Sequence, residues 1–357
     1  MPKPVPVSGV SGLQSRYRDL RDLRTTFPED TLLKICDLTP RCQVSGRYLV
    51  LRKELRQGGR GGFFIDITLC DPTGRVSAKV WDNAQAISER FDQGDVVQIS
   101  GVAELYREEL QLRLAEVTPL APEEADPHDF LPRSQKDPDA LERRLAEFVK
   151  SIQNGYLRDL LLALFKDPQF RADFRTAPAA KALHHSYIGG LIEHTEDVAQ
   201  LCEKVCELFP ALDRDLLIAG AILHDIGKTE ELSWGTAFEY TDRGNLLGHL
   251  VLGEQRVRRE AERIEGFPEE LKQLLSHMIL SHHGEYEYGS PKLPMTAEAI
   301  ALHHAEDLDA KVNMFLDQIG AAREKGRRWT ERHFLLQRAL YAGPPEEVQK
   351  EGVSDAD

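Results

Sequence analysis

The chain contains 357 residues, of which 41% are hydrophobic and 29% charged, and its formal net charge is −14. This composition is typical of a soluble protein with more than one domain, and the negative charge argues against a protein that coats nucleic acid through electrostatics alone. The sequence contains no apolar run near the roughly 20 residues that a membrane-spanning helix needs.

Residues 1–30 lack sustained hydrophobic periodicity, and we expect a flexible N-terminal segment there. The segment also lacks the apolar stretch of a secretory signal peptide. The five cysteines of the chain are an odd number and form no Cys-x-x-Cys pair, which favours reduced thiols over a disulfide framework. Both features indicate a cytoplasmic protein.

Residues 31–120 have the pattern of β-strands. The stretches RYLVLRKEL and GGFFIDITLCD are rich in β-branched and aromatic residues, and DPTG is a turn signal before the strand-like RVSAKVWD. A short helix, NAQAISERF, separates these strands from two more, GDVVQISGVAEL and LQLRLAEVTPL. Three strands, a helix and two strands in this order predict a five-stranded Greek-key barrel, the OB-fold.

The first predicted strand carries a local positive charge, because residues 41–60 contain six Arg and Lys residues and one Glu. OB-folds bind single-stranded nucleic acid through a basic groove and aromatic stacking platforms. A solvated strand face is the alternative explanation of these charges. Trp81 is expected in the barrel core, and Phe63 and Phe64, as neighbours on a strand, should face opposite sides. The candidate nucleic-acid-binding residues are Arg47, Tyr48, Arg52, Lys53, Arg56, Arg60 and Tyr106.

The second half of the chain has a different pattern. Residues 121–140 contain four prolines and many acidic groups, which is typical of a linker. From residue 141 to 340 apolar residues recur at helical spacing, so this range predicts an all-α domain. Residues 341–357 are polar and acidic and are predicted to be disordered. The expected fold class is therefore a multidomain protein with a small all-β OB-fold barrel followed by an all-α domain.

Histidines are concentrated in the predicted helical domain, where ten of the twelve lie between His184 and His304. Imidazole nitrogens and carboxylate oxygens suit divalent ions such as Mn²⁺, Fe²⁺ and Zn²⁺ without a thiolate. His224 and Asp225 are adjacent near the end of an apolar helix, about 100° apart around its axis. The two side chains can therefore approach one metal from two sides, and the carboxylate can bridge two ions.

The order of these motifs resembles the HD superfamily of metal-dependent phosphohydrolases. LIEHT is followed by ILHDIGK, GHL, SHHGEYEYGSP and LHHAEDLDAK over about 120 residues. The stretch KALHHSYIGGLIEHT and the preceding barrel are similar to one subgroup, the YhaM-type 3′→5′ exoribonucleases, in which an OB-fold precedes the HD domain. The resemblance extends over residues 31–325 and implies an all-α HD phosphohydrolase domain at 141–340.

The resemblance also implies the site residues. Glu306 stands where the family has Asp, so either Glu306 or Asp307 is expected to close the metal site. Lys228 matches a lysine that can neutralise the scissile phosphate, and we expect Lys228 and Asp225 to be catalytic. His185, with His184 before it, is a third candidate that can hold the substrate or the leaving group, and a structural role is its alternative. The implied metal ligands are His194, His224, Asp225, His249, His282, His283 and one of Glu306 and Asp307.

The resemblance implies hydrolysis of phosphodiesters with two divalent ions, Mn²⁺ first and Mg²⁺, Co²⁺ or Fe²⁺ as alternatives. The function that we predict is a 3′→5′ exoribonuclease that degrades single-stranded RNA, and single-stranded DNA as a second substrate, to nucleoside 5′-monophosphates. The polarity of digestion comes from the resemblance alone. One alternative is an HD phosphodiesterase that acts on cyclic dinucleotides or free nucleotides. Another is a non-catalytic OB-fold binding module, and a homo-oligomer is compatible with each function.

Overall fold

The computed structural model describes residues 33–58, 61–106, 109–121, 123–181, 185–333 and 336–344. The predicted flexible segment 1–30, Arg60, His184 and residues 345–357 of the predicted acidic tail lie outside this described part of the chain. No helix in the described ranges is both long and apolar enough to cross a membrane.

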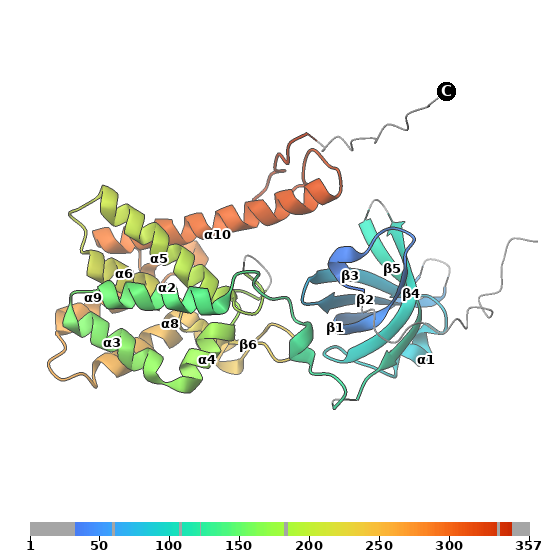
Figure 1. The fold of residues 1–357 in the computed structure, drawn as a ribbon, viewed down its shortest axis with the longest axis horizontal. Helices are drawn as coiled ribbons and strands as arrows, with labels where there is room; N and C mark the ends of the chain where they lie inside the picture. Colours follow the sequence, from blue (N-terminus) through green and yellow to red (C-terminus); the bar gives the residue numbers. More distant parts are fainter. Residues whose placement is uncertain are drawn as a thin grey trace, which may run out of the picture. The chain divides into compact units, whose positions relative to one another are not determined.

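The N-terminal domain is a closed five-stranded barrel (Figure 1). Its strands follow one another around the barrel in the order β1-β2-β3-β5-β4, and β4 pairs with β1 to close it. Only the β3–β5 pairing within this barrel is parallel. The elements are β1 (Gln43–Gln57), β2 (Phe63–Asp71), β3 (Gly74–Val80), α1 (Ala84–Ser88), β4 (Val96–Tyr106) and β5 (Glu109–Pro119). This order confirms the predicted OB-fold.

Alternation along the strands places one set of side chains inside the barrel. Ile65, Ile67 and Leu69 of β2 are at most 1% exposed, and the residues between them are partly exposed. In β1 the alternation breaks near Val50, where a register shift follows and three consecutive residues are buried. The bulge bends β1 so that it can pair with β4 along its first half and with β2 along its second half.

The C-terminal domain is built from helices (Figure 1). They are α2 (Pro138–Ser151), α3 (Gly155–Lys166), α4 (Pro168–Thr176), α5 (Gly190–Leu208), α6 (Arg214–Leu223), α7 (Lys228–Glu231), α8 (Asp242–Ala261), α9 (Glu269–Ser281) and α10 (Ala297–Glu324). Short 3-10 helices lie at η2 (Ile35–Asp37), η3 (Pro127–Phe130) and η4 (Tyr286–Tyr288). The two-residue strands β6 (Leu232–Ser233) and β7 (Glu239–Tyr240) form a small hairpin that the helical pattern did not predict.

Side-chain caps set the starts of several helices. Asp137, Asn154 and Asp167 accept hydrogen bonds from main-chain amides in the first turns of α2, α3 and α4. Asp137 precedes Pro138, and proline is favoured at the first helical position. The helical domain therefore begins at residue 138, inside the predicted linker.

Helix α6 forms the centre of the helical domain. Every residue from Leu216 to Leu223 is buried, and α5, α9 and α10 contact it. A helix that is apolar on all sides is buried on all sides. The polar pair that follows it, His224 and Asp225, is therefore carried into the interior, where the two residues are 0% and 1% exposed.

Candidate metal centre and nucleic-acid surface

Asp225 lies between two pairs of histidines. Its Oδ2 atom is 3.5 Å from Nε2 of His194 and 3.4 Å from Nε2 of His224. Its Oδ1 atom is 3.5 Å from Nε2 of His249 and 3.6 Å from Nε2 of His282. Each carboxylate oxygen therefore faces its own pair of imidazoles, which is the geometry of a bridging ligand.

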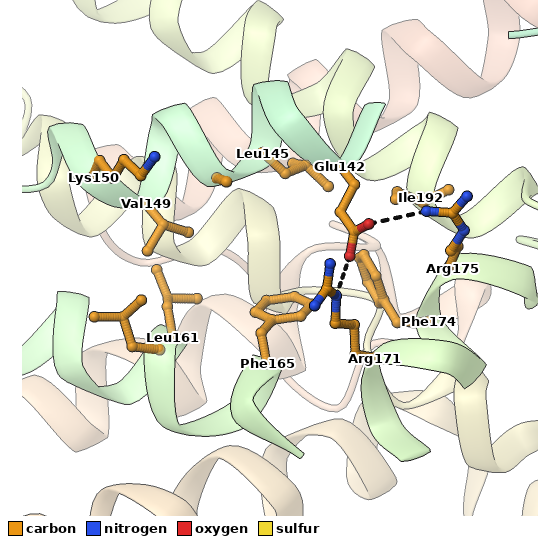
Figure 2. A pocket seen from close by; sticks show the side chains of 12 residues that line it. Glu142, Leu145, Val149, Lys150, Leu161, Phe165, Arg171, Phe174, Arg175 and Ile192 are labelled. Carbon is orange, nitrogen blue, oxygen red and sulfur yellow. Dashed lines mark hydrogen bonds and ion pairs between the residues drawn. The ribbon is translucent and has the colours of Figure 1, made fainter. Parts of the chain in front are cut away.

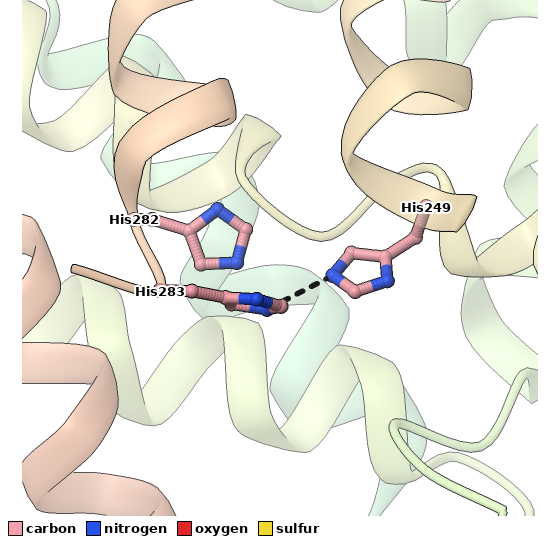
Figure 3. Close-up of side chains that lie close together, drawn as sticks. All are labelled: His249, His282 and His283. Atoms are coloured by element: carbon pink, nitrogen blue, oxygen red, sulfur yellow. Dashed lines mark hydrogen bonds between the residues drawn. The ribbon is translucent and has the colours of Figure 1, made fainter. Parts of the chain in front are cut away.

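Among the described residues, the histidine and carboxylate atoms form three groups, of which two consist of implied metal ligands and the third joins His194 to His185 and Asp309. Within each group the nitrogen or oxygen atoms all lie within 4.8 Å of one another. The first group, the inner group, is His194, His224 and Asp225; the second, the outer group, is His249, His282 and His283. Figure 3 shows the three rings of the outer group turned toward one another, with Nε2 of His249 and Nε2 of His283 3.2 Å apart.

Buried polar atoms in these groups lack partners. Oδ1 of Asp225 and Nε2 of His282 have no hydrogen-bond partner among the described residues. Oδ2 of Asp225 does form an ion pair with Nζ of Lys228, at 2.5 Å. Because buried polar groups are nearly always satisfied, such orphaned atoms around a common point indicate a missing cation. The residues fit divalent metal ions.

Main-chain carbonyls fix the tautomers of three of the histidines. A carbonyl oxygen only accepts, so the Nδ1 atom that contacts it carries the proton and the Nε2 lone pair is left for a metal. Nδ1 of His224, His282 and His283 each lies 2.8 Å from such an oxygen. The three carbonyls belong to Ala221, Ile279 and Tyr288.

Carboxylates perform the same task for the other two histidines. Nδ1 of His194 lies 2.7 Å from Oδ2 of Asp309, and Nδ1 of His249 lies 3.0 Å from Oε1 of Glu231. Burial would raise the pKa of Asp309, but its hydrogen bonds with His185 and His194 hold the pKa well below its ordinary value. A carboxylate behind a ligating histidine orients the ring and raises its basicity.

The sequence analysis assigned no role to Asp309 or Glu231. A signal for each was present, because Asp309 follows Glu306 by three residues and Glu231 follows Lys228 by three. Residues three apart lie on the same face of a helix. Carboxylates at that spacing from implied site residues were therefore candidates for contact with the site.

Glu231 also shapes the helix that carries His249. Gly248 has φ 73° and ψ 158°, so α8 is interrupted immediately before His249. The main-chain amide of His249 donates to Oε1 of Glu231 at 3.0 Å, and this contact caps the second half of α8. One carboxylate oxygen thus both restarts the helix and orients the imidazole.

Burial favours the neutral form of three histidines of the site; at His224 it also opposes the charged form, but the charge of Asp225 raises the pKa of that ring. Burial lowers the pKa of His194 and of His283 to about 4 each, and it lowers the pKa of His282 well below its ordinary value. For Asp225, burial alone would raise the pKa, but the charges of Lys228 and His224 lower it well below its ordinary value. Neutral imidazoles around an ionised carboxylate are the protonation states that metal binding requires.

The two candidates for the closing ligand face different surroundings. Burial, followed by the charge of Asp225, raises the pKa of Glu306 to about 7, so the Glu306 carboxyl senses the metal centre. Asp307 instead forms a 2.7 Å ion pair with Lys311, one turn along α10. This arrangement favours Glu306 over Asp307, and the assignment stays a prediction.

The two further catalytic candidates differ in their contacts. The ammonium of Lys228 reaches Asp225, as expected for a cation at the site, and its side chain is 11% exposed. His185 is buried, with Nε2 3.1 Å from Oδ2 of Asp309 and Nδ1 2.8 Å from the hydroxyl of Tyr187. Since both ring nitrogens of His185 have partners inside the protein, its geometry supports the structural alternative over direct contact with substrate.

The expectation that Tyr48 stacks on a base is wrong. Tyr48 is 1% exposed in the barrel core, and its hydroxyl donates to the main-chain carbonyl of Leu33. Trp81, which was expected in the core, is 49% exposed. Trp81 follows the last residue of β3, and its ring stacks on Phe64 with the ring centroids 4.7 Å apart.

Lys53 was predicted to bind nucleic acid, but it has a structural role. Its ammonium forms a 2.6 Å ion pair with Asp92 and donates to two main-chain carbonyls, and its side chain is only 14% exposed. Arg52 and Arg56 are more exposed and both pair with Glu54. Arg47 is exposed, and Tyr106 is 55% exposed. Fewer basic side chains of residues 41–60 are therefore available to bind nucleic acid than their number suggested.

An aromatic and cationic surface covers the outer face of β2 and β3. Besides the Phe64–Trp81 stack, Nζ of Lys79 lies 4.8 Å from the centroid of the Phe64 ring. Arg56 is paired with Phe64 across β1 and β2 in the register, and Phe63 is 40% exposed. OB-folds bind oligonucleotides on the face of their second and third strands. We call Arg56, Phe64, Lys79 and Trp81 the barrel surface.

A separate apolar cavity of about 290 Å³ lies among α2, α3, α4 and α5 (Figure 2). Glu142 at its edge pairs with Arg171 and Arg175, and Figure 2 shows these ion pairs. None of the residues that line the cavity belongs to the inner or the outer group. The cavity is therefore not part of the metal centre.

Comparisons with known proteins find matches to both domains. The model of the HD domain family matches residues 191–311, and that of an OB-fold nucleic acid binding domain matches residues 44–120. The solved second OB-fold domain of replication protein A from Methanococcus maripaludis matches 25% of this chain and 95% of its own, with 19% identity and a TM-score of 0.22.

Two curated relatives match most of the chain. The 3′-5′ exoribonuclease YhaM of Bacillus subtilis is 34% identical over 300 residues, which is 84% of this chain and 94% of the relative. The 3′-5′ exoribonuclease YhaM of Bacillus licheniformis is 34% identical over 299 residues, or 83% of this chain and 94% of its own. The resemblance inferred from the motifs is confirmed, and the chain belongs to the YhaM family of proteins that combine an OB-fold with an HD domain.

Proposed function

We propose that this protein is a metal-dependent 3′→5′ exoribonuclease that shortens single-stranded RNA and releases nucleoside 5′-monophosphates. One observation carries the proposal: the two carboxylate oxygens of the buried Asp225 each face a separate pair of histidines. The relatives' names support the substrate and the polarity of digestion. Single-stranded DNA is a second substrate of the same chemistry.

Two divalent ions, with Mn²⁺ as our first choice, would supply a deprotonated water and stabilise the leaving oxygen when bound. The inner and outer groups would each hold one, with Asp225 shared between them and Glu306 completing the set. Lys228 stands beside Asp225 and can neutralise a non-bridging oxygen of the scissile phosphate as a point charge. Asp309 and Glu231 keep His194 and His249 in the orientation that ligation needs.

The barrel would hold the strand while the HD domain removes nucleotides from its end. The barrel surface offers two stacked aromatic rings together with a lysine and an arginine. Stacking is tolerant of sequence because every base has a flat face. We also propose that the protein works in the cytoplasm, since its five cysteines are free thiols.

A labelled-substrate assay tests the proposed function. Purified protein with Mn²⁺ is incubated with a 5′-labelled single-stranded RNA and with its DNA counterpart, beside an Asp225→Ala control. We expect a ladder that shortens from the 3′ end and that is absent with EDTA and in the variant.

The other outcomes separate the alternatives. Intact oligonucleotides that remain bound to a protein without metal would replace the proposal with a binding module. Intact oligonucleotides with metal present would replace it with a phosphodiesterase that acts on cyclic dinucleotides or free nucleotides.

A further inference from the structure

The outer metal group is followed in the chain by a turn that carries two exposed tyrosines. The turn is η4, and it begins three residues after His283. Tyr286 is 61% exposed and Tyr288 is 63% exposed, although the apolar ring of a tyrosine is usually more deeply buried. Nothing in the metal centre requires aromatic side chains at these two positions.

Hydrogen bonds hold this turn against the end of α9. The carbonyl of Tyr288 accepts from Nδ1 of the ligand His283 at 2.8 Å, so one end of the turn is fixed to the outer group. Ser290 is 2% exposed, and its hydroxyl lies 2.9 Å from the carbonyl oxygens of Leu280 and Lys292. Since the backbone is already ordered, the two rings lose little conformational entropy when a ligand packs on them.

Two exposed leucines lie close in the chain to His249 of the outer group. Leu246 is 81% exposed and Leu247 is 44% exposed, and both precede His249 closely in the chain. Nε2 of His249 and Nε2 of His283 are 3.2 Å apart, so the segments that carry the leucines and the tyrosines meet at the outer group.

The charges near the tyrosines favour an uncharged part of the RNA as the ligand. Exposed Glu285 and Glu287 precede Tyr286 and Tyr288, so the turn offers carboxylates where a phosphate contact would need cations. The turn therefore suits the face of a base and disfavours the phosphate backbone.

We propose that Tyr286 and Tyr288 form a stacking platform for the 3′-terminal base of the RNA. This inference rests on the exoribonuclease function proposed above and adds a base-binding subsite to it. The platform holds the nucleotide that is about to be released while its phosphodiester lies at the metal centre. Stacking carries little base preference, so the platform suits an enzyme that digests mixed sequences.

Removal of the first nucleotide under single-turnover conditions tests the platform. Two RNAs are compared, one with a normal 3′-terminal nucleotide and one whose 3′-terminal ribose lacks its base. For the wild type with Mn²⁺ we expect faster removal of the normal nucleotide, by roughly tenfold or more. The double variant Tyr286→Ala/Tyr288→Ala should remove both at similar rates.

Two matched variants accompany the test. Tyr286→Phe/Tyr288→Phe keeps both rings and should keep the preference for the base. Phe209→Ala removes a ring that is 60% exposed at the end of α5, outside the metal centre, and should also keep the preference.

The contrary outcomes are distinct. An alanine variant that binds Mn²⁺ normally and still prefers the base would overturn the platform. Loss of bound Mn²⁺ in the alanine variant would also overturn it, because the tyrosines would then only support His283. Wild-type protein that leaves the normal RNA intact would instead refute the exoribonuclease function.

Discussion

At the scale of single residues, the metal centre depends on side chains that do not themselves reach the metal. Asp309 is the clearest case, because it accepts from His194 and from His185 and also from the amide of Asn313. Three partners on one carboxylate leave its position little freedom. The orientation of His194 is therefore set from α10, more than 100 residues away in the chain.

We predict that Asp309→Asn weakens metal binding by roughly 10- to 100-fold, the usual effect of losing a partner behind a ligating histidine. The neutral amide lacks the charge that raises the basicity of His194, and if its oxygen takes the place of Oδ2, its nitrogen cannot accept from Asn313. The measurement is a titration of the metal-free protein with Mn²⁺. Asp307→Asn is the matched control, since Asp307 lies on the same helix but pairs with Lys311 at the surface. Equal affinities in the two variants would contradict the role of Asp309.

Residue-level prediction from the sequence succeeded where a motif fixed the position and failed where burial decided it. The order of the histidines identified the residues that the structure brings together around Asp225. The predicted burial of Tyr48 and of Trp81 was the reverse of what the structure shows. Whether a strand residue faces inward or outward follows from the register and the bulge of β1 rather than from residue type. Asp309 and Glu231 were missed because their partners come from other elements.

At the scale of elements, the interrupted helix α8 determines where His249 points. Gly248 has a positive φ of 73°, a region that residues with a Cβ atom rarely adopt. An unbroken helix through this position would rotate His249 away from its contact with Glu231. The sequence predicted a continuous helix here, because hydrophobic periodicity does not reveal a single-residue break.

We predict that Gly248→Ala lowers the free energy of unfolding by about 1–3 kcal/mol, the cost of a side chain in a backbone region that is essentially restricted to glycine. The same change should weaken Mn²⁺ binding, since His249 would lose its cap and its orientation. Thermal unfolding and metal titration measure the two effects. Gly320→Ala is the control, because a Cβ atom there meets nothing within 4 Å and alanine favours a helix. A Gly248→Ala protein as stable as Gly320→Ala would argue against a required break.

At the scale of the whole molecule, the chain assigns holding and hydrolysis to different domains. The barrel carries the stacked pair Phe64 and Trp81, and the helical domain carries every residue of the inner and outer metal groups. Both domains were predictable from the sequence, because a period of two gives way to a period of 3.6 near residue 140. The exposed barrel surface was not predictable, since it depends on which side of each strand faces outward.

We predict that Trp81→Ala weakens binding of single-stranded RNA by about 1–3 kcal/mol, the contribution of one stacked base. Hydrolysis of a dinucleotide, which offers no extended strand for the barrel to hold, should keep its rate. Binding is measured by fluorescence anisotropy with Asp225→Ala in the background, and hydrolysis by product release. Tyr48→Phe is the control, because it removes only a hydroxyl in the barrel core and should lower stability without changing RNA binding. Slower dinucleotide hydrolysis in Trp81→Ala would contradict the separation of roles.

Gly227, two residues after Asp225, lies in close contact with the main chain of α8, and this contact has a consequence for how such sequences diverge. A Cβ atom at Gly227 would lie 2.0 Å from the carbonyl oxygen of His249 and 2.6 Å from the amide of Gly253. No side chain fits that space, so a lineage that acquires one must move α8 away from the segment that carries the His-Asp pair. A homologue could then keep every residue of the inner and outer metal groups and still lose hydrolysis. In distant homologues, a side chain at the residue after His-Asp-Ile therefore indicates that the helix carrying the equivalent of His249 has moved.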